Sequence, residues 1–133
     1  MSNNGGFGSQ PPTIITLTHY LTPGGDNLIC PDPPKITVSL KTAPRVQFIN
    51  NAPVNVSIKT DVKAFDEANV GVPFPVAPVP AAPVIMTVSQ QLEPGKDGLH
   101  IELQMVNLPP NWDVHACPGI GPNKNGPGMQ VNE

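Results

Sequence analysis

The sequence predicts an all-β protein, a single Greek-key β-sandwich of about seven or eight strands. Three observations indicate this fold: several short segments alternate polar and apolar residues, turn residues separate them at regular intervals, and 19 prolines are spread along the chain. Prolines mark the ends of strands and protect sheet edges from further pairing. With 133 residues the chain has the size of one domain with an independent core.

The strands are expected in the following places. Residues 13–20 are rich in β-branched side chains and end at the turn residues 23–26, and a short run at 28–30 is placed to pair with them. Residues 35–41 alternate without a fault and predict a strand with one buried face. Residues 46–48 and 54–58 also alternate, with Asn50, Asn51, Ala52 and Pro53 as a hairpin-length connection between two antiparallel strands.

The second half of the chain continues the pattern. Strands are expected at residues 84–88 and 99–105, joined through residues 93–98, and a last strand is expected at 112–117. Residues 62–68 form the only helical candidate, and it is short. The predicted domain therefore covers residues 13–118, between a flexible tail at 1–12 and a Gly/Pro/Asn-rich arm at 119–133.

The proline-rich segment 73–83 favours polyproline II and predicts a stiff connection from one sheet to the other. Its Phe74, Val76 and Val79 are expected to cover the end of the core or to contact another subunit. The only tryptophan, Trp112, is expected to close the end of the sandwich or to contact a ligand. These four residues are the predicted interaction residues. The peptide-ligand alternative for 73–83 has two P-x-x-P patterns but no flanking Arg or Lys.

Composition limits the functional classes. Only 13% of residues are charged and the net charge is −3, so no basic surface is expected to attract nucleic acid. The apolar run 70–88 is interrupted by five prolines and does not predict a membrane-spanning helix. The first ten residues show no signal-peptide pattern, so a cytoplasmic location is expected, with export by another route left open. Cys30 and Cys117 are then expected to be thiols, or a disulfide if the protein is exported.

Two stretches resemble the cupredoxin family. One is Val46-Gln47-Phe48-Ile49-Asn50-Asn51 followed by Val54-Asn55-Val56, and the other is Cys117-Pro118 followed by Gly128-Met129 and Val131. The resemblance covers residues 35–131 and implies a cupredoxin-like sandwich, although an immunoglobulin-like strand order fits the same pattern. Val54 or Asn55 stands where this family has its first copper-ligating His, and the second His is also missing.

The main expectation is therefore that the chain holds no cofactor, and copper is the alternative. His115 lies two residues before Cys117, so on a strand their side chains share a face, and with Met129 they form the candidate metal site. His19 and His100 lie on separate predicted strands, and no pair of acids or activated nucleophile can be nominated, so the chain is not expected to be an enzyme. The favoured function is a non-catalytic module for structural assembly or protein recognition, as a homo-oligomer or with a protein partner.

Overall fold

The structure is a computed structural model that describes residues 11–42, 44–89, 98–121 and 124–132. Within these ranges the protein is all-β, as predicted, and has eleven strands and no α-helix. Consequently, the described part of the chain has no helix long and apolar enough to cross a membrane.

The strands form three sheets. The five-stranded sheet has the order β10-β2-β1-β4-β7, and the two three-stranded sheets have the orders β3-β11-β8 and β6-β5-β9. The strands are β1 Thr13–Leu21, β2 Asn27–Asp32, β3 Lys35–Ser39, β4 Arg45–Asn50, β5 Val56–Lys59, β6 Phe74–Val76, β7 Val84–Thr87, β8 Leu99–Glu102, β9 Gln104–Val106, β10 Trp112–Asp113 and β11 Gly128–Asn132.

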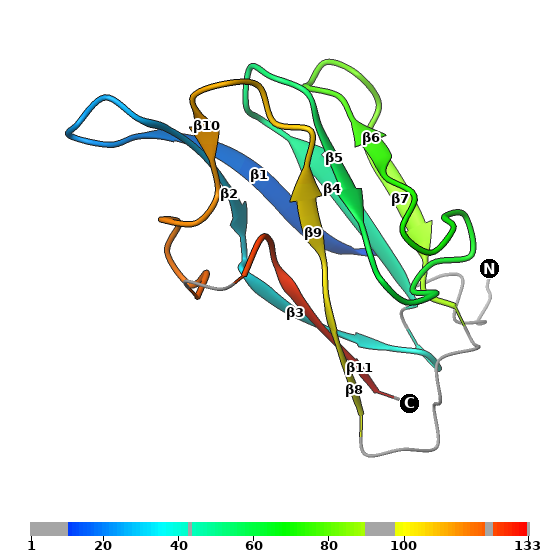
Figure 1. Cartoon of the computed structure of the whole chain (residues 1–133). Helices are drawn as coiled ribbons and strands as arrows, with labels where there is room; N and C mark the ends of the chain where they lie inside the picture. Colours follow the sequence, from blue (N-terminus) through cyan, green and yellow to red (C-terminus); the bar gives the residue numbers. More distant parts are fainter. Residues whose placement is uncertain (1–10, 43, 90–97, 122–123, 133) are drawn as a thin grey trace.

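The five-stranded sheet lies on one side of the molecule and the two smaller sheets lie across from it (Figure 1). The chain passes between sheets at several points. Strands β8 and β9 follow each other almost in line, and they belong to different three-stranded sheets. Likewise the chain leaves the large sheet after β2 and enters a smaller sheet at β3, after the proline pair at 33–34. These crossings hold the two sides of the fold together.

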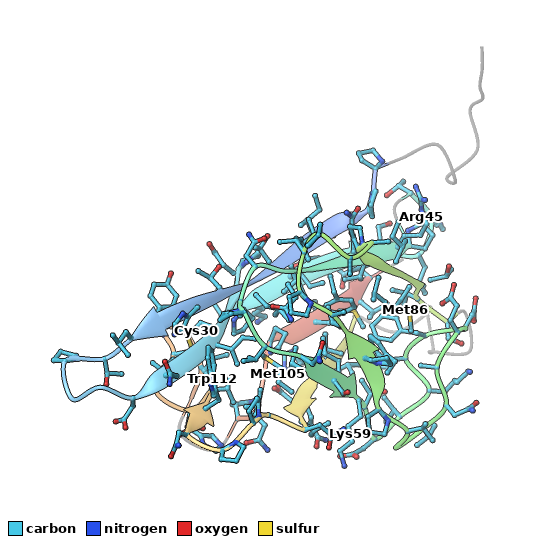
Figure 2. All side chains as sticks on the ribbon, turned by 90° about the horizontal axis from the view of Figure 1, so that it is seen from above. Cys30, Arg45, Lys59, Met86, Met105 and Trp112 are labelled. Carbon is cyan, nitrogen blue, oxygen red and sulfur yellow. A yellow bond between two sulfur atoms is a disulfide. The ribbon has the colours of Figure 1, made fainter. Side chains whose placement is uncertain are left out.

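The space between the sheets is filled by apolar side chains (Figure 2). Met86 of β7 and Met105 of β9 are each only 4% exposed, although they come from opposite sides. An aromatic cluster of Phe48, Phe65 and Phe74 has ring centroids 5.7 to 6.2 Å apart, a spacing at which edge-to-face pairs are attractive. Burying one such ring contributes roughly 2 to 3 kcal/mol.

Several predicted strands are confirmed. β1 and β2 form the antiparallel hairpin expected for residues 13–30. β3 alternates exposed and buried side chains as its sequence pattern predicts. The proline-rich segment does connect two sheets, since β6 belongs to the small sheet and β7 to the large one. It also contains β6, which the sequence pattern did not predict.

Two predictions about the strands are wrong. β4 and β5 are not a hairpin: β4 pairs with β1 and β7, whereas β5 pairs with β6 and β9. The segment 99–105 is not one strand, because the chain changes sheets at Leu103 between β8 and β9. Alternation of residues reports which face is buried and carries no information on the neighbouring strand. Residues 90–97, predicted as part of a connection, lie outside the described residues.

The C-terminal half differs from the prediction in three further respects. The last predicted strand, 112–117, is reduced to the two residues of β10. The predicted arm at 119–133 contains β11, the central strand between β3 and β8, so the domain boundary at residue 118 falls too early. Residues 62–68 form turns and a single β-bridge between Phe65 and Val88 in place of a helix. The predicted N-terminal tail lies almost wholly outside the described residues.

Asn50, the last residue of β4, is 1% exposed and makes three side-chain hydrogen bonds. Its Nδ2 donates to the carbonyls of Val54 and Val76 at 2.8 and 2.9 Å, and its Oδ1 accepts from the amide of Ala52 at 2.9 Å. These bonds turn the chain away from the large sheet and attach the turn to the end of β6. The side-chain amide of Asn50 therefore makes the hydrogen bonds at this turn, in place of those expected for a hairpin between β4 and β5.

Replacing Asn50 with Ala is expected to lower the free energy of unfolding by about 3 kcal/mol, because two carbonyls and one amide lose their partner in a buried place. Urea unfolding measures this change. Asn51→Ala is the matched control, since Asn51 is exposed and next in sequence, and it should change stability by less than about 0.5 kcal/mol. Equal effects of the two substitutions would contradict the assigned role of Asn50.

Candidate functional site

Cys30 of β2 and Cys117 are joined by a disulfide, with an S–S distance of 2.00 Å and a Cα–Cα distance of 5.5 Å (Figure 2 labels Cys30). The expectation of two thiols is therefore wrong for this structure, and its disulfide alternative is correct. Both cysteines are almost fully buried, and the bridge ties the segment after β10 onto the large sheet. This segment, residues 114–121, contributes to three cavities among the described residues.

The three predicted metal ligands have separate surroundings. The sulfur of Cys117 is bonded to Cys30, and Met129 is fully buried in β11. The exposed His115 ring contacts Asn125 through Nε2 and lies 2.9 Å from Asp113 through Nδ1. Among the described residues no group of three or more His, Cys, Asp or Glu side chains could hold a metal ion. Copper binding through His115, Cys117 and Met129 stays a prediction.

The predicted interaction residues also fall in different environments. Val76 is 1% exposed, and Phe74 packs in the aromatic cluster with Phe48 and Phe65. Val79 is 47% exposed, whereas Trp112 is half-buried at the edge of the large sheet. Of the four side chains, only Val76 is fully buried, Phe74 and Trp112 are half-buried, and Val79 is exposed.

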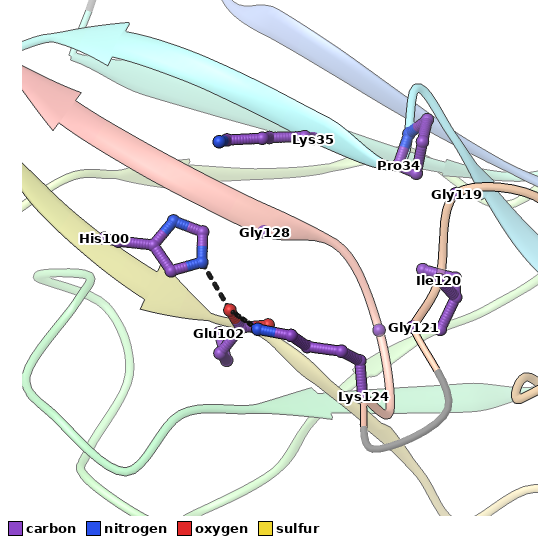
Figure 3. Close-up of a pocket in the computed structure, with 10 residues that line it drawn as sticks. Pro34, Lys35, His100, Glu102, Gly119, Ile120, Gly121, Lys124 and Gly128 are labelled. Carbon is purple, nitrogen blue, oxygen red and sulfur yellow. Dashed lines mark hydrogen bonds and ion pairs between the residues drawn. The ribbon is translucent and has the colours of Figure 1, made fainter.

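The first cavity lies beside β8 and β11 and has a volume of about 210 Å³ (Figure 3). Its charged side chains meet at Glu102, whose Oε2 accepts a hydrogen bond from Lys124 Nζ at 2.6 Å and contacts His100 Nε2. Gly128 lies close to the His100 ring, since a Cβ at this position would lie 2.8 Å from it and the exposed ring would have to shift. The cavity thus has its carboxylate already paired within the chain.

Glu102 has a lowered pKa. Burial raises the pKa of this carboxyl, but hydrogen bonds from Lys124 and His100, together with their positive charge, outweigh that effect. The carboxylate form is therefore favoured at neutral pH. Because the three side chains are 36% to 47% exposed, solvent screens the pairs and their contribution to stability is small.

The second cavity, the Trp112 cavity, lies where the β1–β2 turn meets β10 and has a volume of about 390 Å³. Its polar side chains come from both segments: Thr22, Asp26, Asn27, Asn111 and Asp113, beside the Trp112 ring. Burial raises the pKa of Asp113, but amide hydrogen bonds from His115 and Val114 and the His115 side chain outweigh it and hold this pKa below its usual value. Asp113 is therefore an ionised, fixed group at the rim.

A third feature is the outer face of the large sheet, formed by the outward residues of β1, β4 and β7. Ile14 and Ile85 are each 46% exposed there, and Gln47 lies between them because it is in register with both. Thr16 and Ile49 form the next row. On β4 the outward residues are Arg45, Gln47 and Ile49. Among all outward residues of β1, β4 and β7, Arg45 is the only charged one.

The free side of β7 is covered by Glu67. Its Oε1 accepts a hydrogen bond from the Thr87 amide at 2.8 Å, and its Oε2 accepts one from the Thr87 hydroxyl at 2.9 Å. A carboxylate at this place occupies the amide that an added strand would use. This edge of the sheet is therefore closed to a further strand at Thr87.

Sequence reasoning found Trp112 but missed the groups around it and the role of Glu67. Asp26 and Asn27 are 84 or more positions from Asn111 in sequence, and only the parallel pairing of β10 with β2 brings these segments together. The unusual φ of 70° at Asn111 also has no sequence signal beyond the tolerance of Asn for that conformation. Comparison with protein-family models, curated proteins and solved structures gives no match for this chain.

Removing the disulfide by the double substitution Cys30→Ala and Cys117→Ala is expected to lower the free energy of unfolding by about 4 kcal/mol, because the bridge closes a chain segment of 87 positions. Urea unfolding of the oxidised protein and of the double variant measures the difference. A loss below about 1 kcal/mol would contradict a structural role for the bridge.

Glu102→Gln is expected to reduce stability at pH 7 by about 0.5 kcal/mol at low salt. A carboxyl with a lowered folded pKa stabilises the protein above its unfolded pKa, near 4.5, and loses that contribution as the pH falls through the folded value. Unfolding curves at pH 7 and at about pH 3 should therefore show a difference that disappears in acid. A difference of equal size at both pH values would rule out an origin in the Glu102 charge.

Proposed function

We propose that this chain is a non-catalytic β-sandwich module that assembles with copies of itself through the outer face of its large sheet. The observation behind the proposal is the exposed row of Ile14, Gln47 and Ile85 on three strands whose outward residues include one charged residue, Arg45. Interface centres are depleted in charge and rich in apolar contacts, which matches this composition. The Greek-key strand order, and a cupredoxin-like or immunoglobulin-like relationship, belong to the same proposal.

The geometry of the sheet supports contact between faces. Two sheets pack about 10 Å apart when their faces interlock, so two copies of this face would bury both isoleucines of each chain. Growth at the β7 edge is disfavoured because Glu67 occupies the Thr87 amide. At the other edge β10 has two residues, which offers few amides to a further strand. A closed dimer is therefore favoured over an extended sheet.

The disulfide bears on the compartment in which the module works. Buried bridges of this kind persist in oxidising environments and are rare in the cytosol. This favours the exported alternative over the cytoplasmic one. The proposal of assembly does not depend on this choice.

Sedimentation velocity over a range of concentrations tests the assembly. We expect the wild-type chain to dimerise, and the double substitution Ile14→Glu and Ile85→Glu to weaken the dimer at least about 100-fold, because charges would be buried against each other.

The matched control is Val70→Glu and Val72→Glu, which places the same charges on two residues that are each 52% exposed but lie outside the sheet. This control should dimerise like the wild type. A wild-type chain that stays monomeric up to about 1 mM would contradict the proposal, as would equal weakening by both double substitutions.

A further inference from the structure

The Trp112 cavity has the size of a small-molecule site. Its volume of about 390 Å³ exceeds the 210 and 220 Å³ of the other two cavities and lies within the range typical of ligand pockets. It is formed entirely by described residues, from the turn after β1 and from the segment that contains β10. The assembly proposed above uses another part of the large sheet and makes no demand on this cavity.

The Trp112 ring is held in place before any ligand arrives. The His19 ring lies against it, with centroids 4.6 Å apart at an angle of 36°. His19 is in turn fixed by a hydrogen bond between its Nε2 and Asn27 Oδ1 at 2.9 Å. The backbone is fixed as well, because β10 pairs with β2 in the register Trp112 to Asn27. A fixed ring loses little conformational entropy on binding.

The polar groups of the cavity are also ordered. Thr22 Oγ1 accepts a hydrogen bond from the Asp26 amide at 3.0 Å, which shapes the turn that presents Asp26. Asp113 Oδ1 accepts from the amides of Val114 and His115 at 2.7 and 3.2 Å. Asn111 adopts a φ of 70°, a sparsely populated conformation that places its side chain and Trp112 at the same cavity.

The chemistry of these side chains selects the ligand. The lining contains two carboxylates and no Lys or Arg, which opposes phosphates and other anions. A cation is less well matched, since Asp113 Oδ1 already accepts hydrogen bonds from two amides and lies 2.9 Å from His115 Nδ1. Thr22, Asn27 and Asn111 add neutral donors and acceptors. Such a mixture beside an indole ring fits a molecule with many hydroxyls and one apolar ring face.

We propose that the Trp112 cavity binds a neutral carbohydrate, with one sugar ring stacked on Trp112 and its hydroxyls bonded to Asp26, Asn27, Asn111 and Asp113. Asp26 and Asp113 accept hydrogen bonds from the sugar hydroxyls, and the amide groups of Asn27 and Asn111 donate to the hydroxyl oxygens. The chain then recognises glycans at the end of the sheet that carries β10.

The test uses the full oxidised chain and its single tryptophan as the reporter. Neutral oligosaccharides of glucose, mannose, galactose and N-acetylglucosamine are titrated while Trp112 fluorescence is recorded. We expect a saturable change with at least one of them. Asp26→Ala, at an exposed turn residue, should weaken that binding about tenfold, because it removes a charged hydrogen-bond acceptor without touching the core.

Asp66→Ala is the matched control, since Asp66 is an exposed acid outside the cavity, and it should bind like the wild type. Trp112→Phe should bind more weakly. Because this variant lacks the fluorophore, its binding is measured from changes in amide chemical shifts. Three results would each overturn the proposal: no saturable change with any oligosaccharide, unchanged affinity in Asp26→Ala, or a response to arginine amide in the absence of any response to the sugars.

Discussion

The buried amide of Asn50 is the interaction on which the arrangement of the sheets depends. Its side chain binds Val54, Val76 and Ala52, and its backbone carbonyl accepts a further hydrogen bond from Val79 at 2.8 Å. One residue thereby contacts two of the places where the chain passes between sheets, after β4 and after β6. Because each partner is a buried or partly buried main-chain group that would lose this bond, an apolar side chain of similar size cannot replace it.

The disulfide has the corresponding role at the other end of the large sheet. There the chain between β10 and β11 has little regular structure, and the bond from Cys117 to Cys30 holds it against β2. This segment contributes Ala116 to the Trp112 cavity, which β10 lines with Trp112 and Asp113, and it contributes Gly119 to the other two cavities described above. Glu67 covers the β7 edge of the large sheet by accepting two hydrogen bonds from Thr87. The outer face of this sheet and the cavities near the disulfide remain exposed to solvent.

The sequence was sufficient to predict the fold class and several strands, because alternation of buried and exposed residues has a direct physical cause, as in residues 35–39. It was not sufficient for strand order. The hairpin expected between residues 48 and 56 fails because Asn50 bonds to distant Val76, and β11 was missed because its Gly-rich surroundings resemble a loop. The candidate site was predicted only at Trp112, since Asp26 and Asn27 reach it through the pairing of β2 with β10. Of the predicted metal ligands, Cys117 is bonded to Cys30 and Met129 is buried in the core, and neither environment could be predicted from the spacing of these residues.

The most direct test of this account is hydrogen exchange of the Ala52 backbone amide, measured by NMR. Ala52 lies in a connection outside any strand, yet its amide donates to Asn50 Oδ1 and the residue is 2% exposed. We expect this amide to exchange as slowly as the amides of the central strands, through global unfolding alone. Exchange at the rate of an open loop would show that the Asn50 amide does not hold the crossing between the sheets.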